Sequence, residues 1–251
     1  MIKLPLATDY FDWDVYKIRL TFLQEMLGSN PKDENLFATY VAKKAPTPED
    51  AEEEMDLLRQ NLAKLSEAEK IELRGTTGFL MQEGKPVIKN YVIKGFLKAA
   101  LMSLNRTTLR LAGNSVHAFR KVIDQVTLIE PRWLSIVLPE GQSMGICERS
   151  LRCQTPQGER VALARSETCP EGSTVEFTLK ILPGEFTQKA VEEVLIYGSV
   201  SGLGSWRNAG NGAFQTEYET VGDIKSKRKA VKPAKKSKKV AEVEDEDEDA
   251  E

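Results

Sequence analysis

Strict alternation of apolar and polar side chains predicts two half-buried strands, at residues 15–22 and 174–181. Successive side chains of a strand point to opposite sides of a sheet, so a period of two gathers the apolar residues on one face. These faces are Tyr16, Ile18, Leu20 and Phe22 in the first segment, and Val175, Phe177, Leu179 and Ile181 in the second. Apolar runs at 133–138, 161–164 and about 214–218 predict three further strands.

A charged segment, residues 32–75, is predicted to be an inserted helical arm. Thr47 and Pro48, followed by two acids, are typical of a helix start, with an N-cap, a proline in the first turn and negative charge near the positive end of the dipole. From there a helix is expected to run to near Gly75. Its apolar positions form one narrow stripe, Met55, Leu58, Leu62 and Leu65, so the arm need not join the core.

Three more segments carry apolar residues at the helical spacing of three and four. The first is expected to begin near Lys94, with Phe96, Leu97, Ala100, Leu101 and Leu104 on its inner face. The second carries Val116, Phe119, Val122, Ile123 and Val126 and leads into the strand at 133–138. The third extends from Gln188 to about Val200, with Val191, Val194 and Leu195 inward.

The order of these elements predicts an α+β fold of the ferredoxin-like, RRM type. Without the arm and a turn-rich segment at 139–172, expected to be a β-rich insertion of short strands, the order is strand, helix, strand, strand, helix, strand. That order implies an antiparallel sheet with helices on one face. The domain is expected to span residues 1–221. Residues 222–251, here called the tail, lack aromatic residues and periodicity and are expected to be disordered.

The composition indicates where the protein is located and whether it binds a metal ion. The 251 residues contain neither a secretory signal pattern nor a long uncharged stretch, so we expect a cytoplasmic protein, in a bacterial cell or a phage-infected host, without membrane contact. Cys147, Cys153 and Cys169 are six and sixteen positions apart, with His117 the single histidine. Zinc sites pair their ligands about two to four residues apart, so no metal and no other cofactor is expected.

The charge distribution leaves a nucleic-acid partner open. The net charge is −3, but nine basic and nine acidic residues lie in the tail, which leaves 26 basic and 29 acidic residues elsewhere. Binding would therefore need a locally basic groove. The tail has a basic block followed by an acidic block, and three roles stay open for its acidic end: competing with nucleic acid for that groove, docking a protein partner, or aiding solubility.

A glycine-rich loop at residues 202–212, GLGSWRNAGNG, is the strongest candidate site. The residues singled out are Gly202, Gly204, Trp206, Arg207, Asn208, Gly210 and Gly212. Glycines permit positive φ and close approach to a ligand, so consecutive N–H groups can bind an anion, while Trp206 can stack on a base and Arg207 can neutralise a phosphate. The alternative is a tight helix-to-strand connection with Trp206 in the core.

Together with two further motifs, this loop resembles the RAMP superfamily of CRISPR backbone and guide-RNA-processing proteins. The family carries such a loop between the second helix and fourth strand of a ferredoxin-like unit. Its helix-opening motif, with serines before Lys-Gly and an arginine after it, is similar to residues 86–98, where Lys94, Gly95 and Lys98 match. The ending of the first strand, LTFLQEMLGSNP, is also similar. The serine positions hold Tyr91, Val92 and Ile93, which indicates a divergent relative, with a phage-encoded protein as one reading.

This resemblance implies a non-catalytic protein that binds single-stranded nucleic acid, RNA in preference to DNA, and polymerises along it as a homo-oligomer. Lys94 and the free N–H groups at its helix start would bind a phosphate, with Lys98 on the same face. In the alternative reading, these lysines solvate the outer side of an amphipathic helix. The other candidates are a phage single-stranded-DNA-binding replication or recombination protein and a structural or inhibitory mimic of an effector subunit.

A metal-independent endoribonuclease is the one enzymatic alternative. The resemblance places Asp33 near the cutting aspartate of some backbone subunits, although an acid after Asn-Pro-Lys is also ordinary turn chemistry. His117 has no evident base partner and is expected to be structural. Walker, HExxH and dinucleotide-binding motifs are absent from the sequence, so we expect no metabolic enzyme.

Overall fold

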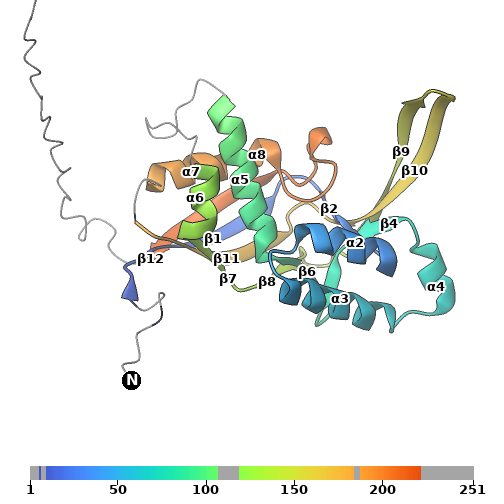
Figure 1. Ribbon diagram of the computed structural model, residues 1–251, viewed down its shortest axis with the longest axis horizontal. Coiled ribbons are helices and arrows are strands. Elements are labelled where there is room, and N and C mark those ends of the chain that lie inside the picture. The colour runs from blue at the N-terminus through green and yellow to red at the C-terminus, as the bar shows by residue number, and fades with distance from the viewer. Residues whose placement is uncertain (1–5, 7–9, 107–118, 184–186, 222–251) are drawn as a thin grey trace, which may run out of the picture.

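An antiparallel sheet of seven strands forms the body of the protein, in the order β12, β1, β11, β8, β6, β5, with β7 also paired to β11. The computed structural model describes residues 6, 10–106, 119–183 and 187–221 (Figure 1). The strands of this sheet are β1 (Asp14–Phe22), β5 (Leu80–Gln82), β6 (Lys85–Lys89), β7 (Thr127–Glu130), β8 (Trp133–Val137), β11 (Thr174–Ile181) and β12 (Phe214–Val221).

The strand order confirms the predicted ferredoxin-like fold. Along the chain, β1, α5 (Asn90–Arg106), β7 with β8, β11, α7 (Gln188–Ile196) and β12 follow the predicted sequence of strands and helices. Strands β12 and β11 flank β1, and both pairings are antiparallel. The second strand of the pattern is divided, because β7 and β8 pair with opposite ends of β11. The sequence pattern identified only β8 of these two pieces.

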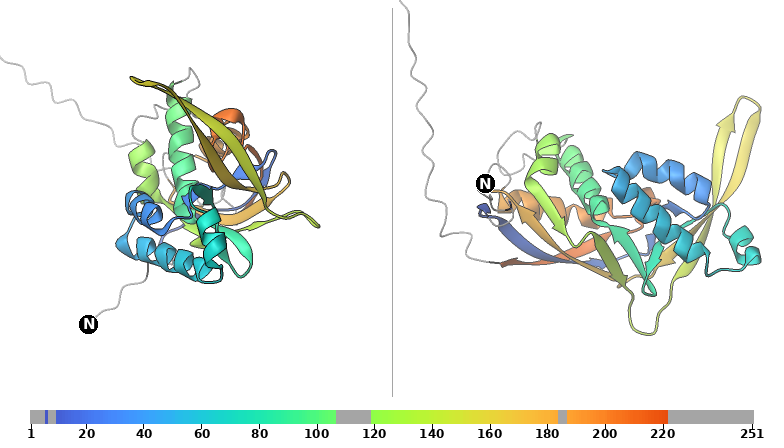
Figure 2. Two further views of the ribbon diagram at one scale, coloured as in Figure 1. Left: turned by 90° about the vertical axis from the view of Figure 1, so that its right-hand side faces the viewer. Right: turned by 60° about the horizontal axis from the view of Figure 1, so that its bottom comes forward.

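The helices α5, α6 (Phe119–Val126), α7 and α8 (Gly198–Ser201) lie on one face of this sheet (Figures 1 and 2). The main core fills the space between them, and every residue predicted to face inward from β1, β11 and α5 is buried. So are the three predicted residues of α7. Two boundaries were wrong: α5 begins at Asn90, one turn before Lys94, and α7 ends at Ile196, after which α8 follows.

The arm contains three helices, α2 (Glu34–Lys44), α3 (Pro48–Leu62) and α4 (Glu67–Glu72). Thr47 caps α3 as predicted, but α3 ends at Leu62, and Ser66 begins α4 with a capping box. Helix α2 was not predicted from the sequence, because only Phe37 and Val41 of that helix are buried and they leave a weak apolar pattern. These two residues form a second hydrophobic cluster with Leu58, Leu80 and Val87. The arm thus packs on β5 and β6, through a cluster separate from the main core.

A long hairpin of β9 (Gly145–Thr155) and β10 (Gly158–Cys169) projects from the body (Figures 1 and 2). The segment is rich in β-structure, as expected, but its strands are long and not short. The sequence pattern did not indicate their length, because the outer halves of both strands are exposed and lack a buried alternating face. The base of the hairpin belongs to a second sheet, in which β10 pairs with β9, β2 (Met26–Leu27) and β4 (Thr76–Gly78). Strand β3 (Asn30–Pro31) pairs with β4.

Several sequence predictions fall outside the described residues, namely those on Val116, His117 and the tail. Within the described ranges, Cys147 and Cys169 are free thiols, and burial raises the pKa of Cys169 to about 12. In the same part of the chain, no group of three His, Cys, Asp or Glu side chains is arranged to hold a metal ion. A search of the described helices found none with the length and apolar character needed to cross a membrane.

The second cluster predicts a cost for truncating Leu58, which is 1% exposed. Leu58→Ala removes buried methyl groups and leaves a cavity, so we expect the free energy of unfolding to fall by roughly 2–5 kcal/mol. Leu36→Ala is the matched control, since Leu36 on the neighbouring helix is 58% exposed and should change stability by less than about 0.5 kcal/mol. Urea unfolding of both variants gives the comparison. Equal, small effects would contradict the packing described for the arm.

Candidate nucleic-acid interface

A cleft of about 870 Å³ lies between the arm, α5 and the glycine-rich loop. Its basic lining residues are Lys44 of α2, Lys94 and Lys98 of α5, Arg132 before β8, and Arg207 of the loop. The acidic lining residues are Asp50 and Asp124. The cleft is therefore a locally basic groove in a protein whose net charge is negative, and it brings together cations that are far apart in the sequence.

On the α5 side, Lys94, Gly95 and Lys98 all line the cleft, as does Asp124 at the C-terminal end of α6. The Lys94 ammonium donates to the backbone carbonyl of Asp124 at 3.1 Å, and Lys98 forms an ion pair with the Asp124 carboxylate at 2.6 Å. Burial lowers the pKa of Lys94, against the opposing effect of the Asp124 charge. Both lysines thus face the cleft beside a single carboxylate.

The helix start differs from the prediction in a way that affects anion binding. Because α5 begins at Asn90, Lys94 lies in its second turn, where backbone N–H groups bond to carbonyls within the helix. The N–H groups without such partners belong to the first turn, and that of Asn90 donates to the Arg132 carbonyl at 2.9 Å. A phosphate near Lys94 would therefore meet its side chain and not its backbone N–H.

The glycines of the loop let three backbone segments approach one another closely. An added Cβ at Gly204 would lie 2.4 Å from the Leu27 carbonyl oxygen, and one at Gly212 would lie 1.8 Å from that of Leu203. Both residues also have positive φ. The Ser205 N–H donates to Leu27 O at 2.9 Å, which ties the loop to β2. These contacts give the loop a fixed shape, whatever it binds.

Within this frame the predicted loop residues separate into three groups. Gly204 and Arg207 line the cleft. Arg207, Asn208 and Gly210 line a smaller hollow of about 400 Å³ on the other side of the loop. Gly202 and Gly212 are buried inside the loop. Trp206 is 44% exposed, so the alternative that places it in the core is wrong.

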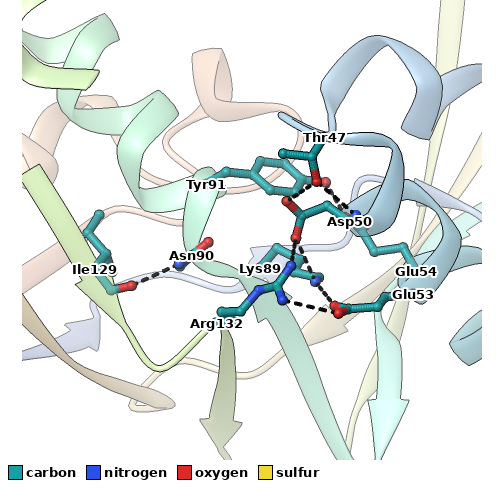
Figure 3. A network of polar contacts seen from close by, with 9 residues as sticks. All are labelled: Thr47, Asp50, Glu53, Glu54, Lys89, Asn90, Tyr91, Ile129 and Arg132. Carbon is teal, nitrogen blue, oxygen red and sulfur yellow. Dashed lines mark hydrogen bonds and ion pairs between the residues drawn. The ribbon is translucent and has the colours of Figure 1, made fainter. Parts of the chain in front are cut away.

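A charge network around the buried Lys89 fixes the arm against the start of α5 (Figure 3). The Lys89 ammonium, 1% exposed, lies 3.1 Å from Asp50 and 2.5 Å from Glu53 of α3. Arg132 contacts the same two carboxylates at 2.5 and 3.2 Å. Burial alone would raise the pKa of Asp50, but hydrogen bonds from Arg132, Lys89 and Thr47 outweigh it and lower the pKa. Asp50 is therefore held as the anion that the two cations require.

A third carboxylate of the network, Glu54, has its pKa shifted in the opposite direction to that of Asp50. Glu54 is 2% exposed and accepts a hydrogen bond from the Tyr91 hydroxyl at 2.8 Å. Burial raises the pKa of Glu54 to about 7, and the nearby charges of Asp50 and Glu53 add to that shift. Burial likewise raises the pKa of Tyr91 and of Tyr40, which lines the same cleft. Both phenols are therefore neutral at neutral pH, where Glu54 is close to the midpoint of its titration.

Asp33, the candidate cutting residue, caps α2. Its Oδ1 accepts hydrogen bonds from the backbone N–H groups of Asn35 at 3.0 Å and Leu36 at 3.1 Å. It does not line the cleft. Lys44, Lys89 and Arg132 were not predicted as site residues. One signal was present for Lys89, because it directly follows the apolar residues Pro86, Val87 and Ile88.

Comparisons with known proteins find little sequence similarity. No family model and no curated protein matches this chain. A solved chain that is similar belongs to the cryo-EM structure of the Type III-B Cmr-beta bound to cognate target RNA, with a TM-score of 0.48 and 8% identity. The match covers 83% of this chain and 61% of that one. The fold assignment above therefore rests on the strand order and not on this comparison.

The raised pKa of Glu54 predicts a pH dependence of stability. The unfolded side chain titrates near its usual 4.5, so between that pH and about 7 the folded state holds a proton that the unfolded state has lost. Stability should fall as the pH rises through this window, by on the order of 3 kcal/mol. Glu54→Gln should remove that loss, whereas Glu52→Gln, an exposed position on the same helix, should keep it. Urea unfolding across the window tests this, and parallel curves for all three proteins would contradict it.

Substitutions of Asp33 can distinguish its role as a helix cap from a role in catalysis. Asp33→Ala should lower the free energy of unfolding by about 1 kcal/mol, whereas Asp33→Asn keeps an acceptor oxygen and should have little effect. Neither variant should alter the integrity of labelled RNA after incubation. If the unmodified protein cuts the RNA and the stable Asp33→Asn variant does not, the residue is catalytic and this interpretation is wrong.

Proposed function

We propose that this protein binds single-stranded nucleic acid, RNA in preference to DNA, in the basic cleft, and that it does so without catalysis. One observation carries the proposal. The two motifs that resemble RAMP backbone subunits, around Lys94 and around Arg207, are more than a hundred residues apart in the sequence, yet both line this cleft. One ligand could contact both motifs only if the fold placed them in the same cleft, and this fold does so.

The charges of the cleft suit a phosphate backbone. Among the described residues, no carboxylate lies within 4.0 Å of the Lys44 ammonium or the Arg207 guanidinium, whereas the other cations contact Asp50 or Asp124. Those two charges are free to neutralise phosphates. Gly95 is exposed, and an added Cβ there would meet nothing within 4 Å. This leaves open space for a ligand over the second turn of α5.

The tyrosines of the cleft favour binding over cleavage. Cutting RNA without a metal requires a base to remove the proton of a 2′-hydroxyl, and such a base needs a pKa near the working pH. The raised pKa values of Tyr40 and Tyr91 keep both phenols protonated, so they are poor bases. Glu54 has a pKa near 7, but it is 2% exposed and does not line the cleft. Asp33 is engaged as a helix cap.

Residues 1–221 would form the binding domain of a divergent RAMP relative, and copies would bind side by side along the strand. The tail would be a separate segment, and its acidic end would contact a protein partner or the basic cleft. In this account the buried network around Lys89 sets the distance between the two walls of the cleft.

Removing both α5 lysines provides the test. Lys94→Ala with Lys98→Ala should weaken binding of single-stranded RNA by roughly tenfold or more and reduce the salt dependence, because phosphate contacts are lost. Lys17→Ala with Arg19→Ala removes the same charge from β1, where both side chains are exposed, and should leave binding unchanged. Fluorescence anisotropy with labelled RNA, DNA and duplex over a salt series measures both.

Two results would contradict the proposal. Loss of binding in the β1 variant alone would place the ligand on the open face of the sheet. Loss of binding in a chain that ends at Thr220 would place it on the basic block of the tail. Equal affinity for RNA and DNA would refute only the preference for RNA.

A further inference from the structure

Trp206 and Arg149 form a contact between the glycine-rich loop and the base of the projecting hairpin. The Arg149 guanidinium lies over the Trp206 ring, 4.9 Å from its centroid. Arg149 belongs to β9 and is partly buried, whereas Trp206 is 44% exposed. One side of a large aromatic ring is thus supported by a planar cation while much of the ring stays accessible.

The backbone of Trp206 has a conformation that residues with a Cβ rarely adopt. Trp206 has φ 53° and ψ 39°, in the left-handed region. Bonds on either side of it keep it there, from Ser205 N to Leu27 O at 2.9 Å and from the Asn211 side-chain amide to Trp206 O at 3.2 Å. An exposed aromatic ring fixed in this way meets a ligand with little further loss of conformational freedom.

The charge beside the ring is not neutralised by a neighbour. The side-chain contact found for Arg149 in the described part of the chain, besides the ring, is a hydrogen bond to the Ser166 hydroxyl at 3.4 Å. No carboxylate there lies within 4.0 Å of its guanidinium. The next residue after Trp206 is Arg207, which lines the cleft. A stacking surface and two cations therefore follow one another from the cleft to the hairpin.

We infer that Trp206, supported by Arg149, is a platform on which one unpaired base stacks, next to the phosphates bound in the cleft. The inference rests on the proposed function and extends it, because it assigns base contact to a surface outside the cleft and a role to Arg149. It also explains selectivity for single strands. A base in a duplex is already stacked and paired, so it cannot reach the ring.

The test compares two ligands of equal length, oligouridylate and a ribose-phosphate oligomer without bases. Trp206→Ala should weaken binding of oligouridylate by roughly 5- to 150-fold and leave binding of the abasic oligomer within about twofold. Arg149→Ala should act in the same direction. Arg160→Ala is the matched control, since this arginine lies on the same hairpin and contacts Gln157. Oligouridylate should also quench tryptophan emission, and Trp206→Phe should remove that quenching although Trp13 and Trp133 remain.

Each outcome has a defined meaning. A selective loss for oligouridylate supports the platform. An equal loss for both ligands would mean that Trp206 only maintains the loop, and no loss for either would mean that no base stacks there; both overturn the inference while the cleft proposal stands. If the unmodified protein binds neither ligand, the proposed function fails and the platform fails with it.

Discussion

The rest of the cleft depends on the ion pairs that the buried Lys89 ammonium forms with the arm. An unpaired charge in a protein interior is very costly, so this side chain requires its carboxylate partners. Asp50 and Glu53 supply them from the arm, and Arg132 binds the same pair from the turn before β8. The Trp133 ring, 4.3 Å from the ammonium, covers it from the adjacent strand. The arm is therefore held against the ferredoxin-like body at the point where α5 begins, and the two form opposite walls of the cleft.

The glycine-rich loop supplies the third wall by a different physical means. Its shape follows from backbone segments that only glycine allows to meet, with Gly204 against Leu27 and Gly212 against Leu203. The loop is thereby tied to β2, and Arg207 points into the cleft while Trp206 contacts the hairpin. The glycines and the charged residues thus have separate roles, because the glycines shape the loop and the charged residues make the cleft basic.

Sequence patterns could predict elements that bury one regular face. The alternation in β1 and β11 and the inner face of α5 are examples, because burial imposes the period of two or of three to four. The hairpin of β9 and β10 buries neither face over its outer half, so its residues show no period. Contacts between distant segments, such as Lys89 with the arm and Arg149 with Trp206, leave no local pattern. The segments around Lys94 and Arg207 stand out in the sequence, but the cleft that both of them line depends on the fold.

The measurement that tests the central claim most directly is the mapping of crosslinks between the protein and a photoreactive single-stranded RNA. The account predicts crosslinked peptides from the first turns of α5 and from residues 202–212, with β9 near Arg149 as a neighbouring site. Crosslinks confined to the open face of the β1, β11 and β12 sheet, or to the basic block of the tail, would contradict it.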